Sequence, residues 1–144
     1  MALLATKNQL ETLLTKNQVT LKNLYELKQD MGTLLDASST IYYKDCEDIK
    51  LKIDSKVNRL IFDQCKNIVV ELCGVISGIE IKKSCGISIN IKRKFPLNSI
   101  LIEKSKYISL SLSKKSHNDT FYQIDKSHGI MVMDHKNKAL YLKN

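Results

Sequence analysis

The sequence predicts a mainly β protein, built as a parallel β-solenoid of about five to six rungs. A ten-residue phrase returns five times, with 19, 19, 21 and 22 residues between successive copies. Within each copy apolar residues alternate with polar ones, and a period of two residues is typical of strands. A unit of about 20 residues with two short strands cannot bury its apolar face alone, so the copies must stack.

Each copy is centred on a small residue that is flanked by apolar residues three and five places away on both sides. The small residues are Cys46, Cys65, Ser84, Ser105 and Ser127. They should face inward at a corner between two strands. Cys46 and Cys65 would then stack about 4.8 Å apart, the spacing of neighbouring strands. A disulfide is sterically conceivable there, but we favour two small, reduced, buried side chains.

Residues 1–36 differ from the repeat and are predicted to form an N-terminal helical segment. Their leucines recur at three-, four- and seven-residue steps, and no proline interrupts them, which indicates an amphipathic helix. Such a helix would either cap the solenoid or self-associate. An alternative is that Val19 to Leu27 forms an atypical first strand. Gly32 and the run 36–39 mark the boundary with the solenoid domain at 37–135.

The last nine residues, 136–144, are predicted to be a separate C-terminal strand. The repeat stops at Asp134, where earlier copies carry an apolar residue. Beyond it the chain offers one more short apolar run: Ala139, Leu140, Tyr141 and Leu142. No sixth copy follows to cover this run, and an open solenoid end invites strand addition. We therefore expect these four residues to mediate dimerisation.

The net charge of +8 lies on the repeat, because residues 1–36 hold four lysines and four acidic residues. A positive surface favours an acidic partner, whether protein, nucleic acid or anionic lipid. Lys83, Lys104 and Lys126 each precede a small corner residue, so stacking should align them as a basic ladder. Lys92 and Arg93 could extend it.

Three segments resemble successive turns of the C-terminal domain of cyclase-associated proteins. They are Ser55-Lys56-Val57-Asn58, Pro96-Leu97-Asn98-Ser99-Ile100-Leu101-Ile102-Glu103-Lys104, and Leu110-Ser111-Leu112-Ser113-Lys114. The resemblance covers about residues 41–134 and implies a right-handed β-helix. It also implies binding of monomeric actin, with a preference for the ADP form, and either nucleotide exchange or sequestration. In the family, dimers form by exchange of a C-terminal β element.

The resemblance selects Lys56, Lys104 and Lys114 as first candidates for actin contact, since these lysines match the family phrases. The chain departs from the family in two places, with Ser55 for a glycine and Leu110 for a tyrosine. The family's N-terminal domain, proline-rich stretch and short actin-binding motif are not found in this sequence. The complete predicted actin-binding set is Lys56, Lys83, Lys92, Arg93, Lys104, Lys114 and Lys126.

Other function classes are less consistent with the sequence. We expect no enzyme, no cofactor and no metal site, because no phosphate loop, zinc spacing or paired carboxylates in a pocket are evident. A related solenoid in the tubulin-folding cofactor C family regulates a GTPase through an arginine, but Arg59 and Arg93 lie in other contexts. A basic nucleic-acid-binding solenoid would need interleaved aromatic residues. The apolar run after Met1 lacks a basic start, which favours a cytoplasmic, cytoskeleton-associated protein without a membrane span.

Overall fold

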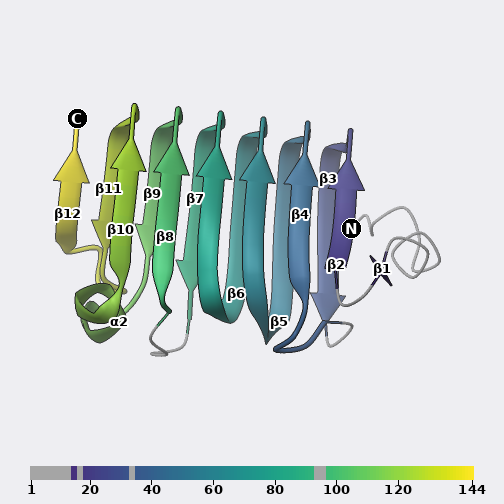
Figure 1. Cartoon of the computed structure of the whole chain (residues 1–144), viewed down its shortest axis with the longest axis horizontal. Helices are drawn as coiled ribbons and strands as arrows, with labels where there is room; N and C mark the ends of the chain where they lie inside the picture. The colour runs from purple at the N-terminus through teal and green to yellow at the C-terminus, as the bar shows by residue number, and fades with distance from the viewer. Residues whose placement is uncertain (1–13, 16–17, 33–34, 93–96) are drawn as a thin grey trace.

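The computed structural model describes residues 14–15, 18–32, 35–92 and 97–144, and in it the strands wind into a solenoid (Figure 1). The strands are β1 (Leu14–Thr15), β2 (Gln18–Lys22), β3 (Tyr25–Gly32), β4 (Thr40–Lys44), β5 (Glu47–Asp63), β6 (Lys66–Lys82), β7 (Cys85–Ile91), β8 (Ser99–Glu103), β9 (Lys106–Ser111), β10 (Phe121–Asp125), β11 (His128–Met133) and β12 (Ala139–Lys143). A short helix, α2 (Lys114–Asp119), lies between β9 and β10.

The strands stack as two parallel layers, which we call face A and face B. Face A consists of β2, β4, residues 59–63 of β5, residues 78–82 of β6, β8 and β10. Face B consists of β3, residues 47–53 of β5, residues 66–72 of β6, β7, β9 and β11, and it ends with the antiparallel strand β12. The long strands β5 and β6 each pass from face B to face A of the next rung. The predicted β-solenoid is therefore confirmed.

Tight corners join face A to face B along one edge of the solenoid, and longer connections, including α2, run along the opposite edge (Figure 1). We call the second of these the loop edge. Its described connections are residues 54–58, 73–77, 112–120 and 134–138. The two edges lie a strand apart, or about 20 Å for six residues. Residues on different edges therefore cannot share one small binding site.

The core lies between the two faces and follows the predicted alternation. On face B the in-register column Ile49, Ile68, Ile87, Ile108 and Ile130 is buried. Adjacent residues point in opposite directions, since Val70 is 1% exposed and Val69 is 44% exposed. The small corner residues Cys46, Cys65, Ser84, Ser105 and Ser127 are all buried, as predicted.

Each corner turns through residues with left-handed backbone angles. The residue before the small position has a positive φ in every rung: Asn23 (56°), Asp45 (55°), Gln64 (55°), Lys83 (48°), Lys104 (50°) and Lys126 (50°). A second positive φ follows two places after the small position, at Asp48, Asn67, Gly86, Tyr107 and Gly129 among others. This conformation reverses the chain within a few residues, but it is strained for side chains other than Gly, Asn and Asp.

The prediction of an amphipathic helix at residues 1–36 is wrong for the part that the structure describes, and residues 1–13 lie outside that part. Residues 18–32 form β2 and β3, which add a rung before the first copy of the repeat. Val19 and Leu21 pair in register with Ile41 and Tyr43 of β4 and are buried. The alternative of an atypical first strand is thus correct. Pairing of β2 with β4 supplies backbone hydrogen bonds and buries apolar side chains. This stabilisation outweighs the preference for a helix that the spacing of the leucines suggested.

The C-terminal strand forms as predicted, and in the single chain it pairs with β11. Leu140 packs against the core, whereas Leu142 is 62% exposed. The ring of Tyr141 stacks on Tyr122, with centroids 6.3 Å apart. The apolar residues of this strand therefore point to different sides. Among the described residues, no helix is long and apolar enough to span a membrane.

Candidate binding surface

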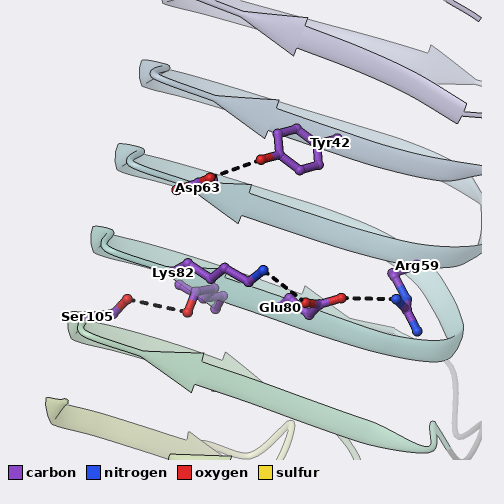
Figure 2. Close-up of polar contacts among 7 residues, drawn as sticks. Tyr42, Arg59, Asp63, Glu80, Lys82 and Ser105 are labelled. Atoms are coloured by element: carbon purple, nitrogen blue, oxygen red, sulfur yellow. Dashed lines mark hydrogen bonds and ion pairs between the residues drawn. The ribbon is translucent and has the colours of Figure 1, made fainter. Parts of the chain in front are cut away.

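Three charged side chains on face A, Arg59, Glu80 and Lys82, are paired with one another. Glu80, whose side chain is 17% exposed, forms one ion pair with Arg59 at 3.1 Å and another with Lys82 at 3.5 Å. The Tyr42 hydroxyl donates to Oδ2 of Asp63 at 2.9 Å (Figure 2). Burial and the neighbouring Asp63 carboxylate raise the pKa of Tyr42. These contacts satisfy Arg59, Glu80 and Asp63 within the chain.

The tight corner of the later rungs carries a cluster of basic side chains that we call the basic corner. It consists of Lys83, Lys104, Lys106, Lys126 and His128, and it lines a shallow groove of about 280 Å³. The floor of the groove includes Ser84 and Ser105 from the buried corner positions. The predicted ladder of Lys83, Lys104 and Lys126 is therefore present on one edge.

The four lysines of the basic corner form no ion pair with any residue that the structure describes. Neighbouring rungs lie about 4.8 Å apart. Two unit charges at that distance repel by about 1 kcal/mol in water. Lys83, Lys104 and Lys126 also occupy left-handed positions that asparagine or glycine would fill with less strain. The corner is thus held in an electrostatically and conformationally unfavourable form, which a bound anionic group would partly relieve.

Charge changes sign along this edge. The equivalent corner positions of earlier rungs carry Asp45, Glu47 and Asp48. Asp48 accepts a hydrogen bond from the side-chain amide of Asn67 in the next rung. The cationic surface therefore begins one rung later, at the exposed Lys66, and extends toward the C-terminal end.

The other predicted contact residues lie away from the basic corner. Lys56 and Lys114 are exposed at the loop edge, and Lys114 is the first residue of α2. Lys92 also follows a face B strand, and its ammonium lies 3.0 Å from Oε1 of Glu71. That hydrogen bond raises the pKa of Lys92. Arg93 lies outside the described residues. Of the first candidates, only Lys104 belongs to the basic corner.

Three residues of this corner escaped sequence analysis. Lys106 and His128 occupy the place directly after a small residue, and this position in the repeat could have revealed them. Tyr107 is 61% exposed, and its ring meets that of His128 edge-on, with centroids 5.9 Å apart. A Cβ at Gly129 would come within 2.8 Å of the Tyr107 ring, so the absent side chain makes room for it.

The structure shows no cluster suited to metal binding among the residues it describes, since nowhere do three His, Cys, Asp or Glu side chains come together. Among the acidic residues of the early corner, Asp45 and Glu47 are half-buried and Asp48 is exposed. Two carboxylates in different environments would be needed for paired acid and base chemistry.

Fold and surface together define a parallel β-solenoid that presents a row of cations on one edge. A family model described as adenylate cyclase associated (CAP) C terminal matches residues 8–140. The chain therefore belongs to this family, which is known generally for actin binding. A comparison with curated protein sequences finds no match.

Among solved structures, the fold is similar to the crystal structure of cyclase-associated protein from Cryptosporidium parvum. The TM-score is 0.73 and the sequence identity 18%, over 90% of this chain and 78% of that one. At this identity the similarity concerns the fold, and it agrees with the stacked strands described above.

Proposed function

We propose that this chain binds monomeric actin, prefers the ADP-bound form, and regulates actin turnover by promoting nucleotide exchange or by sequestering the monomer. Membership of the CAP C-terminal family, over residues 8–140, carries this proposal. The net charge of +8 supports it, because the surface of actin is acidic and opposite charges accelerate encounter.

The basic corner is the proposed centre of the contact. Its four lysines have no ion-pair partner among the described residues, whereas Arg59 and Lys82 on face A, and Lys92, are already paired. A bound acidic surface would remove the mutual repulsion of the lysines. Lys56 and Lys114, at the loop edge, would contribute only if actin also reached that edge.

The cofactor C type of function is less well supported. A GTPase activator needs an arginine that is available to the transferred phosphate. Arg59 is held by Glu80 at 3.1 Å, on face A. A dimer formed by exchange of β12 and a cytoplasmic, cytoskeleton-associated location belong to the proposal as consequences of the family.

The test is a binding titration with purified monomeric actin, in its ADP and ATP forms, at two or more salt concentrations. The variant Lys83→Glu/Lys104→Glu/Lys126→Glu replaces attraction with repulsion at the basic corner. We expect a loss of about 1 to 5 kcal/mol for each lysine in true contact. The matched control is Lys56→Glu/Lys114→Glu, which changes charge only at the loop edge and should bind nearly as tightly as the wild type.

A nucleotide-exchange assay on ADP-actin separates the two modes of action. Faster release of ADP indicates exchange, and slower release together with tight binding indicates sequestration. A wild-type chain without salt-sensitive affinity for actin would refute the proposed function. If the corner variant kept its full affinity for actin and the loop-edge variant lost affinity, the contact with actin would be assigned to the loop edge instead.

A further inference from the structure

Two cysteines lie directly above one another at the corner of successive rungs. Lys44 pairs with Asp63 and Glu47 pairs with Lys66, so Cys46 and Cys65 occupy equivalent places between the paired segments. The Lys66 N–H donates to the Cys46 carbonyl at 2.9 Å. Neighbouring strands are about 4.8 Å apart, and a disulfide joins Cα atoms separated by about 4.4 to 6.8 Å.

Both thiols point into the same interior column. Cys46 is 1% exposed and Cys65 2%. The Cys46 Sγ lies 3.3 Å from the carbonyl oxygen of Lys44, and the Cys65 Sγ lies 3.5 Å from that of Asp63, so the two side chains have the same orientation. The two thiols thus lie one rung apart in the same column, where one can donate a hydrogen bond to the other.

This hydrogen bond makes the two thiols chemically unequal. It lowers the pKa of Cys46 to about 7, against the effect of burial. The same contact, together with burial, raises the pKa of Cys65. Cys46 is therefore the residue that supplies a thiolate near neutral pH, and the thiolate is the nucleophile in cysteine chemistry.

The remaining cysteines have no such neighbour. Cys73 begins a connection at the loop edge, and Cys85 pairs in register with Lys66 and Lys106. In later rungs the corner position is serine, which cannot form a disulfide. The stacked thiols are thus specific to the rungs of β4–β5 and β5–β6.

We propose that Cys46 and Cys65 form a reversible redox site that a hydroperoxide oxidises to an intramolecular disulfide. The Cys46 thiolate attacks the terminal peroxide oxygen, the O–O bond breaks, and the leaving oxygen takes a proton to give water or an alcohol. Cys65 then attacks the resulting sulfenic sulfur. Its proton and the departing hydroxide form water, and the S–S bond closes. Two electrons pass to the peroxide, and a dithiol reductant reverses the step.

The first rung controls access to the pair. The Cys46 Sγ lies 3.7 Å from the carbonyl oxygen of Leu21, and the Glu47 N–H donates to Leu24 at 2.9 Å, so β2 and β3 cover the site. A single rung can open locally at a lower free energy than the whole chain unfolds. Its transient opening would admit a small peroxide. The disulfide would then close a loop of the chain and restrict the unfolded state.

The test uses the full chain in a Cys73→Ser/Cys85→Ser background, treated with hydrogen peroxide. We expect the two remaining thiols to be lost together, a mass change of two hydrogen atoms, a monomeric band on a non-reducing gel, and a higher melting temperature that a dithiol reverses. The rate should rise with pH through about 7, as Cys46 ionises.

The control variants add Cys46→Ser or Cys65→Ser to the same background. Serine fits this position, because Ser84, Ser105 and Ser127 occupy it in other rungs. Each control should lose the paired mass change and the reversible gain in melting temperature. Two thiols that stay reduced under peroxide, or a disulfide that links separate chains, would overturn the proposal.

Discussion

The backbone N–H of Ser84 donates a hydrogen bond to Oγ of Ser105 in the next rung, at 3.1 Å. The contact recurs along the corner, from Cys65 N–H to Ser84 Oγ at 3.1 Å and from Ser105 N–H to Ser127 Oγ at 3.0 Å. Each hydroxyl in turn lies within 2.9 Å of a carbonyl oxygen two residues before it. The small corner residues therefore join the rungs as well as fitting the turn.

Ser105→Ala should destabilise the fold by about 1 to 3 kcal/mol, because it leaves the buried N–H of Ser84 without an acceptor. Urea denaturation measures the effect. The matched control is Ser55→Ala, since the buried hydroxyl of Ser55 has no hydrogen-bond partner among the described residues. That change should be neutral or stabilising. Equal losses in both variants would show that the corner hydroxyls contribute only by packing.

Val70→Asp should destabilise the protein by several kcal/mol, because it buries a carboxylate between rungs without a partner. Val69→Asp, one residue earlier, should be nearly silent, since Val69 faces solvent. Chemical denaturation of both variants gives the comparison. Similar damage from both would contradict the period-two burial on which the solenoid depends.

Acidification should weaken the packing of α2 against β10. Nδ1 of His117 lies 2.8 Å from the Tyr122 hydroxyl, and burial lowers the pKa of His117 from its ordinary value of 6.5. The unfolded chain then binds the proton more readily than the folded chain. Stability is therefore lost as the pH falls through about 6.5 toward the lower folded-state pKa.

Denaturation midpoints at pH 7.5 and 5.5 measure this dependence in the wild type and in His117→Asn. The asparagine can reach the place of Nδ1 but does not titrate in this range. We expect a smaller difference between the two midpoints in the variant. An unchanged difference would assign the pH dependence to other groups.

The C-terminal strand is predicted to mediate dimerisation. In the single chain β12 pairs with β11, and exchange of β12 between two copies would reproduce the same hydrogen bonds in trans. Wild-type protein should sediment as a dimer, and a chain lacking residues 136–144 as a monomer. Leu142→Ser should weaken the dimer without unfolding the chain, because this predicted dimer contact is 62% exposed in the single chain. A monomeric wild type would contradict the prediction.

Sequence analysis located the corners, the inward positions and the end of the repeat correctly. These features are local, because alternation within one copy already specifies which side chains turn inward. The first rung was predicted only as an alternative to a helix, for a physical reason. Leu21 fits both a helical spacing and a strand, and only its register with Tyr43 of β4 decides between them.

By itself the sequence determined a stacked β architecture, a buried column of small corner residues and a surplus of positive charge on the repeat. Tertiary structure decided which charges act together. Lys104 lies at the tight corner with Lys83 and Lys126, whereas Lys56 and Lys114 lie a strand's length away at the loop edge. The conformation of the connections at the loop edge likewise depends on contacts between neighbouring rungs. Stacking, which joins residues about 20 positions apart, therefore assembles the basic corner and the thiol pair.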